Sequence, residues 1–178
     1  MRYLLILGLL VVPAVVAAQE AHPPVTIADS EVHRLRSTSV GDEFELHVAF
    51  PPGVARGESA DLPVLFVLDS NEDFSLVTTL VRRFQDAGDL PQLLIVGIGY
   101  PEYPRYYRSR DYTPTDSERT DRPSGGAADF LAFLQGELIP YLREEFSVSD
   151  RRVILGHSLG GLFLLYALRT DQAFSRRR

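Results

Sequence analysis

The spacing of apolar residues predicts the first strands of the chain. Between residues 43 and 50 apolar and polar side chains alternate, with Phe44, Leu46 and Val48 on one side. A period of two is typical of a strand with one buried face. The run 64–68 is apolar throughout and partly β-branched or aromatic, which is typical of a central strand in a parallel sheet covered on both faces.

Helical periodicity separates these strands from two more. The apolar residues that recur at helical spacing between 73 and 87 are Leu76, Val77, Leu80, Phe84 and Ala87, and Gly88 stands where a C-cap belongs. The later segments are a strand over 93–98, a helix over 125–146 capped by Ser124 and kinked at Pro140, a strand over 152–155 and a helix over 159–168. This alternation predicts an α/β fold, with a mostly parallel sheet, antiparallel leading strands and helices on both faces.

The first eighteen residues have the layout of a secretory signal peptide. A positive start at Arg2 is followed by an apolar run and by small residues at 16–18, ahead of a cut before Gln19. The alternative, a membrane anchor, needs about 20 apolar residues, and this run is shorter and contains Pro13. No later run is long enough to cross a bilayer. We therefore expect export to the periplasm or the extracellular medium, a flexible leading segment over 19–30 and one domain over 31–178.

Composition narrows the chemistry. A length of 178 residues suits one domain, and 18 basic against 24 acidic residues give a net charge of −6, which argues against nucleic-acid binding. The absence of cysteine excludes disulfides, a thiolate nucleophile and a cysteine-ligated zinc. All basic residues are arginines, so lysine-dependent chemistry is excluded as well. No cluster has metal-ligand spacing, and we expect neither a metal nor a cofactor.

One segment indicates nucleophilic catalysis. Residues 156–160, Gly-His-Ser-Leu-Gly, fit the pattern G-x-S-x-G, entered by a β-branched strand and left by an apolar helix. In a nucleophile elbow the serine, here Ser158, sits on a strained turn that lifts its hydroxyl clear of the sheet. Flanking glycines avoid collisions there, and the Leu159 N–H points at the developing oxyanion. The alternative is a glycine-rich turn with an idle serine.

The residues around this elbow resemble the α/β-hydrolase branch that includes enterochelin-esterase-like and esterase-D-like enzymes and the mycolyltransferases. The similar segments are Arg152–Gly161, Val67–Asp69 with the turn after it, Arg108–Pro114 and Glu137–Tyr141. The resemblance covers about residues 30–170 and implies a partial α/β-hydrolase domain. It implies that a second oxyanion donor is the N–H of Asn71, in a turn where this chain has Ser70 and the family often has glycine.

The helpers of such a serine are absent from the sequence. A serine hydroxyl needs an imidazole base and a carboxylate, which follow the serine in α/β-hydrolases. The four histidines are His22 in the leading segment, His33 and His47 on early strands, where we expect them to face solvent far from the elbow, and His157 beside the serine. None follows Ser158, and Asp171 is the only acid beyond it. We expect a crippled or inactive hydrolase.

Two features favour a truncated chain over a genuine minimal protein. The helix over 159–168 is apolar nearly all round, and the strand over 152–155 would form an open hydrophobic edge. An apolar helix surface and an open strand edge are both normally covered by further segments of a protein.

Weaker features surround the expected site. A loop over 100–112 interleaves tyrosines and arginines, and Arg108, Arg110 and Tyr112 are candidates for the rim of a substrate pocket. The alternative, which we favour, is a loop pinned by Arg–Asp and Arg–Glu pairs. Asp69 is expected to hold its turn by accepting backbone hydrogen bonds.

The function predicted from the sequence is hydrolysis of a small-molecule carboxylic ester through an acyl-enzyme at Ser158. The alternatives are a non-catalytic, degenerate hydrolase that acts as a binding module, and an acyltransferase that passes the acyl group to a sugar hydroxyl. Neither the identity of the ester nor an oligomeric state follows from the pattern.

Overall fold

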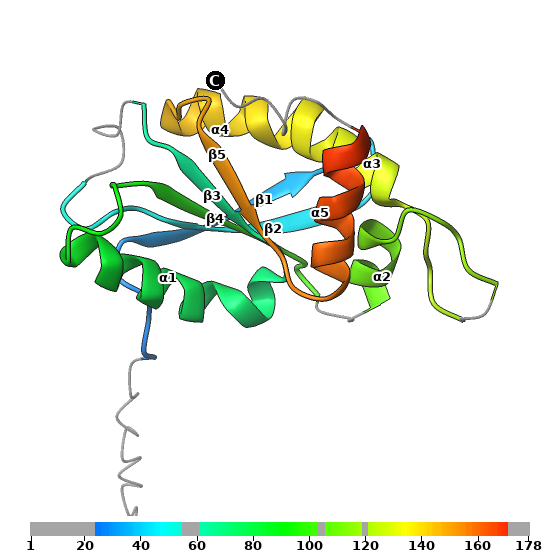
Figure 1. Ribbon diagram of the computed structural model, residues 1–178, viewed down its shortest axis with the longest axis horizontal. Coiled ribbons are helices and arrows are strands. Elements are labelled where there is room, and N and C mark those ends of the chain that lie inside the picture. The colour runs from blue at the N-terminus through cyan, green and yellow to red at the C-terminus, as the bar shows by residue number, and fades with distance from the viewer. Residues whose placement is uncertain (1–23, 55–60, 103–105, 119–120, 171–178) are drawn as a thin grey trace, which may run out of the picture.

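A computed structural model describes residues 24–54, 61–102, 106–118 and 121–170 (Figure 1). The predicted signal peptide and residues 19–23 of the leading segment lie outside these ranges. The described end of the leading segment is held in place. Ile27 packs against the sheet, and the carbonyl oxygen of Asp29 accepts a hydrogen bond of 2.9 Å from the Phe50 N–H.

Five strands form one mixed sheet in the order β1-β2-β4-β3-β5. Their bounds are β1 Ser30–Arg36, β2 Glu43–Ala49, β3 Val64–Val67, β4 Leu94–Gly99 and β5 Arg152–Leu155. β2 pairs antiparallel with β1 and with β4, whereas β3 pairs parallel with β4 and with β5. The predicted parallel sheet with antiparallel leading strands is confirmed, and β3 is buried along its whole length.

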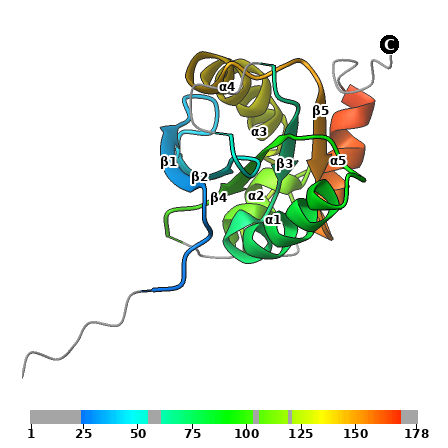
Figure 2. The same ribbon diagram turned by 90° about the vertical axis from the view of Figure 1, so that its left-hand side faces the viewer.

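Helices cover both faces of this sheet, as predicted (Figures 1 and 2). Their bounds are α1 Ser70–Asp86, α2 Tyr106–Tyr112, α3 Ala127–Phe133, α4 Ile139–Phe146 and α5 Leu159–Thr170. α1 packs on one face, and the other four lie on the opposite face, where the larger core is. That core contains the predicted apolar side of β2, with Phe44 stacked on Phe133 at a centroid distance of 4.3 Å.

The buried face of α1 differs from the prediction. The helix begins at Ser70, three residues before the expected start, and buries Ser70, Phe74, Thr78 and Val81. Leu76, Leu80 and Phe84 of the predicted stripe are exposed. The face of α1 that packs on the sheet is therefore the face that contains Ser70, and it is not the most apolar face of the helix. Gly88 follows the C-cap in the left-handed region at φ +80°, as its predicted role requires.

The long helix predicted over 125–146 is interrupted by a wider turn. A π-helical turn, Leu134–Leu138, separates α3 from α4 immediately before Pro140. Proline removes one backbone donor and its ring clashes with the carbonyl four residues earlier, which a π turn relieves. The prediction that Ser124 caps this helix is wrong: the N-cap is Gly126, and the Ser124 hydroxyl bonds to Asp116 and to the Ser117 N–H.

Among the described strands, β5 is the last of the sheet, and its outer side is apolar. Val153 and Leu155 are 65% and 40% exposed on the α1 side, and Leu162, Leu165 and Leu168 of α5 are exposed as well. The open edge and the apolar outer side of α5 were predicted from the sequence.

Candidate active site

Ser158 lies on a strained turn between β5 and α5. Its φ of +54° is in the left-handed region, where a residue other than glycine is uncommon, and its side chain is exposed. Gly156 makes the turn possible, because a Cβ there would lie 2.9 Å from the backbone carbon of Gly160 and 3.0 Å from Leu68. The geometry therefore has the strain, the exposure and the glycine clearance expected of an elbow.

The predicted first oxyanion donor lies beside this serine. Leu159 is the first residue of α5, where backbone N–H groups have no partner within the helix. The turn is closed by hydrogen bonds from the Gly160 N–H to the His157 carbonyl, at 2.8 Å, and from the Leu162 N–H to the Ser158 carbonyl, at 3.1 Å. The positive end of the α5 dipole therefore lies next to the Ser158 hydroxyl.

The predicted second donor comes from the neighbouring strand-to-helix turn. β3 and β5 are adjacent and parallel, and the Leu68 N–H donates to the Leu155 carbonyl at 3.0 Å. Asn71 is the second residue of α1, so its N–H also belongs to a first helical turn. Its side-chain amide is fixed by Tyr100, donating to the Tyr100 carbonyl at 2.9 Å and accepting from the Tyr100 N–H at 2.8 Å.

Arg108, a predicted rim residue, joins the two turns. Its guanidinium binds both oxygens of the buried Asp69 carboxylate, at 2.7 and 2.8 Å, and reaches the His157 carbonyl at 3.4 Å. Asp69 itself adopts φ +54° ahead of α1, and its side chain makes no capping hydrogen bond. The expectation that Asp69 accepts backbone hydrogen bonds through its side chain is wrong, because an arginine outside the turn takes the carboxylate.

Tyr112, predicted at a pocket rim, is buried, and Arg110 is bound by two carboxylates. Tyr112 is 0% exposed, and its hydroxyl accepts a hydrogen bond of 3.3 Å from the Asp69 N–H. Burial, followed by the charge of Asp69, raises the pKa of Tyr112. Arg110 binds Asp111 at 2.6 Å and Asp42 at 3.0 Å. The segment forms helix α2 where a loop was expected, and the favoured alternative of arginines pinned by carboxylates fits these contacts.

Burial and ion pairing act against each other on Asp111. Burial, the larger effect, raises the pKa of Asp111, and hydrogen bonds from Arg110 and the Tyr100 hydroxyl oppose it. These groups form a polar cluster that ties α2 to Tyr100 at the end of β4 and to Asp42 before β2.

The histidines occupy different places from those predicted. The side chains of His33 and His47 are only 15% and 18% exposed. His33 bonds to Tyr141 on α4, and His47 bonds to Ser70 at the start of α1. The prediction that they face solvent is wrong, because a helix covers each of them. His157 is exposed beside the elbow, while His22 and Asp171 lie outside the described residues.

Within the described ranges, no imidazole forms a hydrogen bond with the Ser158 hydroxyl. The bonding partners of His33 are Tyr141 and Glu31, and those of His47 are Ser70 and Glu45. The same ranges contain no group of three or more histidine, aspartate or glutamate side chains that could hold a metal ion. None of the helices placed in them is long and apolar enough to span a membrane.

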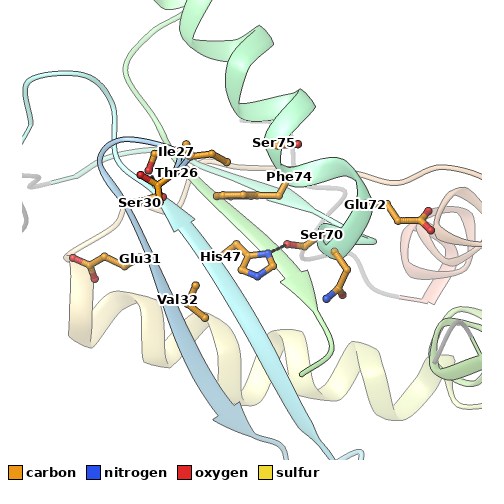
Figure 3. A pocket seen from close by; sticks show the side chains of 11 residues that line it. Thr26, Ile27, Ser30, Glu31, Val32, His47, Ser70, Glu72, Phe74 and Ser75 are labelled. Carbon is orange, nitrogen blue, oxygen red and sulfur yellow. Dashed lines mark hydrogen bonds between the residues drawn. The ribbon is translucent and has the colours of Figure 1, made fainter. Parts of the chain in front are cut away.

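A cavity of about 590 Å³ lies on the α1 side of the sheet (Figure 3). Its lining includes His47, Ser70, Asn71, Glu72 and Phe74. Neither this cluster nor the pairing of Arg108 with Asp69 follows from the motifs of the sequence. A usable signal was present in Gly97 and Gly99, which share one face of a buried strand and so indicate a close approach by another segment.

Comparison with known proteins identifies the family to which the chain belongs. The model of the family described as "Putative esterase" matches residues 37–176. The chain is 34% identical over 161 residues to the ferri-bacillibactin esterase BesA of Bacillus subtilis, and 31% identical over 159 residues to the siderophore triacetylfusarinine C esterase of Aspergillus fumigatus. These matches cover 82% and 83% of this chain but 55% and 53% of the relatives, so the chain spans about half of their length.

Solved structures agree with this placement. The crystal structure of the BES protein from Bacillus cereus is 29% identical to this chain with a TM-score of 0.74, over 85% of this chain and 60% of that one. The siderophore hydrolase EstB from Aspergillus nidulans is 28% identical, with a TM-score of 0.73, over 85% of this chain and 55% of that one. The predicted fold class is confirmed, and the chain belongs to this esterase family of the α/β-hydrolases.

Proposed function

We propose that this chain provides the nucleophile and the oxyanion-binding part of a serine esterase. The observation that supports this most strongly is the elbow. Ser158 is exposed at φ +54°, directly after a parallel strand, and Gly156 gives it clearance. Strain of this kind costs of order 1–3 kcal/mol and persists mainly where function requires it.

In the proposed reaction the Ser158 oxygen attacks the carbonyl carbon of an ester. A carbon–oxygen bond forms, and the carbonyl oxygen becomes an oxyanion held by the Leu159 and Asn71 N–H groups. These donors begin helices of 12 and 17 residues, whose dipoles add to the stabilisation. As the bond forms, the Ser158 hydroxyl gives up its proton to solvent water. Collapse of the intermediate then breaks the ester bond, the leaving oxygen takes a proton from water and departs as the alcohol, and a further water hydrolyses the acyl-enzyme.

The described residues supply no base for this serine, so we propose slow turnover by the chain as it stands. In other serine hydrolases, oxyanion stabilisation and binding alone retain about 10³–10⁴-fold acceleration over water when triad residues are removed. Acylation by an activated ester should therefore remain measurable. The acyl-enzyme should then persist, because none of the imidazoles in the described ranges is positioned to activate the attacking water.

A small-molecule carboxylic ester is the proposed substrate. Two relatives are named as esterases of ferri-bacillibactin and of the siderophore triacetylfusarinine C, which makes siderophore esters the first compounds to test. We also propose that the chain is exported, on the basis of its N-terminal sequence.

The test is covalent labelling with a fluorophosphonate, followed by peptide mapping. We expect slow labelling confined to Ser158 and reduced to background in Ser158→Ala. Ser75→Ala removes an exposed hydroxyl on α1 and should label like the unmodified chain. Labelling spread over several serines, or none above background, would contradict the proposal.

A second candidate function is a non-catalytic binding module. It is favoured by the absence of any imidazole contact to Ser158 among the described residues. In that case Ser158 should be no more reactive than Ser75, while a siderophore ester should bind without being cleaved. Calorimetric titration combined with the labelling experiment distinguishes the two functions.

A further inference from the structure

We propose that Ser70, His47 and Glu45 form a hydrogen-bonded relay that positions the Asn71 N–H for oxyanion binding. The inference rests on the proposed function, because it concerns the second oxyanion donor. In this scheme Ser70 and His47 are positioning residues, and neither touches the reacting atoms.

The relay begins at a notch that two glycines make in β4. A Cβ on Gly97 would lie 2.3 Å from the Ser70 hydroxyl oxygen, and a Cβ on Gly99 would lie 2.4 Å from Asn71 Oδ1. Side chains two residues apart lie on the same face of a strand. The first two residues of α1 are therefore seated on the sheet side by side, in the space that these two missing side chains leave.

The neighbouring strand supplies the other members at matching positions. In the antiparallel pairing of β2 with β4, His47 is opposite Gly97 and Glu45 is opposite Gly99. Imidazole Nδ1 of His47 is hydrogen-bonded to the Ser70 hydroxyl, as Figure 3 shows, and Nε2 lies 3.1 Å from Glu45 Oε1. A polar residue of β2 therefore lies opposite each of the two glycines of β4.

The directions of these hydrogen bonds depend on the tautomer of His47. With the proton on Nε2, the imidazole donates to the Glu45 carboxylate, and Nδ1 accepts the hydrogen bond of the Ser70 hydroxyl. Glu45 is paired in turn with Arg34, at 3.6 Å. The Ser70 side chain, in a residue only 2% exposed, is therefore held by a chain that extends to the surface of the sheet.

The relay acts on the peptide bond that carries the donor. Asn71 is fixed through its side chain by Tyr100 on one side, and its N–H belongs to the peptide that follows Ser70. Fixing both side chains leaves that N–H little freedom to rotate. An oxyanion donor works only when it already points to where charge develops, so a looser Ser70 should slow acylation.

The main test is the rate of Ser158 acylation by p-nitrophenyl acetate in the full chain. Losing an oxyanion donor outright costs about 10²–10³-fold in rate, and a misplaced donor should cost less. We expect Ser70→Ala to lower the limiting acylation rate roughly tenfold, with little change in the ester concentration that gives half the limiting rate. A change confined to that concentration would contradict a positioning role.

Two substitutions of His47 separate the effect of its hydrogen bond to Ser70 from the effect of its side-chain volume. The amide of asparagine reaches the place of Nδ1, whereas the amide of glutamine reaches the place of Nε2. His47→Asn should therefore keep the bond to Ser70 and most of the rate, while His47→Gln should resemble Ser70→Ala. Equal rates for the two variants would overturn the proposal, provided that circular dichroism shows both to be folded.

Val81→Ala is the matched control. Val81 is buried on the same face of α1 but lies away from its first turn. Its truncation should lower the melting temperature and leave the acylation rate of the folded protein unchanged. If Val81→Ala slows acylation as much as Ser70→Ala does, general loosening of α1 explains the effect and the relay does not. If Ser158 of the unmodified chain is not acylated at all, the proposed function fails first, and this inference with it.

Discussion

The two strand-to-helix turns at the carboxyl edge of the sheet share a backbone feature and differ in everything around it. Asp69 between β3 and α1 and Ser158 between β5 and α5 both adopt φ +54°. Asp69 is buried, and both of its carboxylate oxygens are bound by Arg108. Ser158 is exposed, and none of the described residues hydrogen-bonds to its hydroxyl.

The contrast indicates a division of labour between the turns. A strained residue persists only where its surroundings determine it. At Asp69 the conformation is fixed by the ion pair with Arg108 and by the hydrogen bond from the Asp69 N–H to the Tyr112 hydroxyl. At Ser158 it is fixed by the fit of Gly156 against Gly160 and Leu68, which leaves the hydroxyl available for chemistry. The Asp69 turn can therefore act as a rigid support for the Ser158 turn, in which the serine is exposed.

Removing Arg108 should have the largest effect on this pair of turns. Arg108→Met would leave the Asp69 carboxylate buried without its cation. Breaking a buried pair costs about 3–5 kcal/mol, and we expect about 3 kcal/mol because the Arg108 side chain is 20% exposed. Urea unfolding measures the change. Arg108→Lys should recover only part of the loss, since lysine cannot make the bidentate contact.

Arg152 offers a matched control for that substitution. It pairs with Asp150, whose side chain is 81% exposed, and exposed pairs contribute about 0–1 kcal/mol. Arg152→Met should therefore cost less than about 1 kcal/mol. Similar losses for the two variants would mean that the Asp69 pair does not hold its turn.

Gly156 tests the second turn and should give the next largest effect. Gly156→Ala would place its Cβ against the backbone of Gly160, and backbone atoms cannot move aside as a flexible side chain can. Overpacking of this kind costs about 1–3 kcal/mol, and we expect about 2 kcal/mol together with loss of Ser158 labelling. The measurements are urea unfolding and the fluorophosphonate rate.

Gly136 is the control for the glycine substitution. A Cβ at this helical position would meet nothing within 4 Å. Gly136→Ala should leave stability unchanged or raise it by up to about 1 kcal/mol. A comparable loss at both glycines would show that the tight contact at the elbow is not the cause.

Much of this architecture was predictable from the sequence, because it depends on local patterns. The alternation in 43–50 and the apolar run 64–68 indicate directly which side chains are buried. The elbow motif indicates a tight turn that few residue types can adopt. The predicted strands over 43–50, 64–68, 93–98 and 152–155 match β2, β3, β4 and β5 to within a residue or two.

The errors arose where a tertiary contact decides the outcome. The alternation in β2 identifies His47 as polar-facing but cannot show that α1 covers that face. The apolar spacing in α1 favours Leu76, Leu80 and Phe84, yet the fit of Ser70 on Gly97 turns another face inward. The sequence predicts a loop at Tyr112, because the helix that contains it is short and depends on packing against Asp69 and Phe163.

Glu137 gives the smallest expected effect and shows how a carboxylate held by hydroxyl and backbone N–H groups compares with Asp69. Burial alone would raise the pKa of Glu137, but hydrogen bonds from Ser39 and Thr38 outweigh it and lower the pKa. A carboxyl whose folded pKa is lowered contributes stability above its unfolded pKa and loses it as the pH falls through the folded value. Glu137→Gln should therefore cost about 1 kcal/mol at pH 7, and its gap from the unmodified chain should narrow once the pH falls below the ordinary glutamate value of about 4. Glu144→Gln, at an exposed site on α4, should show no such gap in parallel urea titrations. A gap that does not narrow at all as the pH falls would mean that packing, rather than charge, holds the turn over residues 37–39.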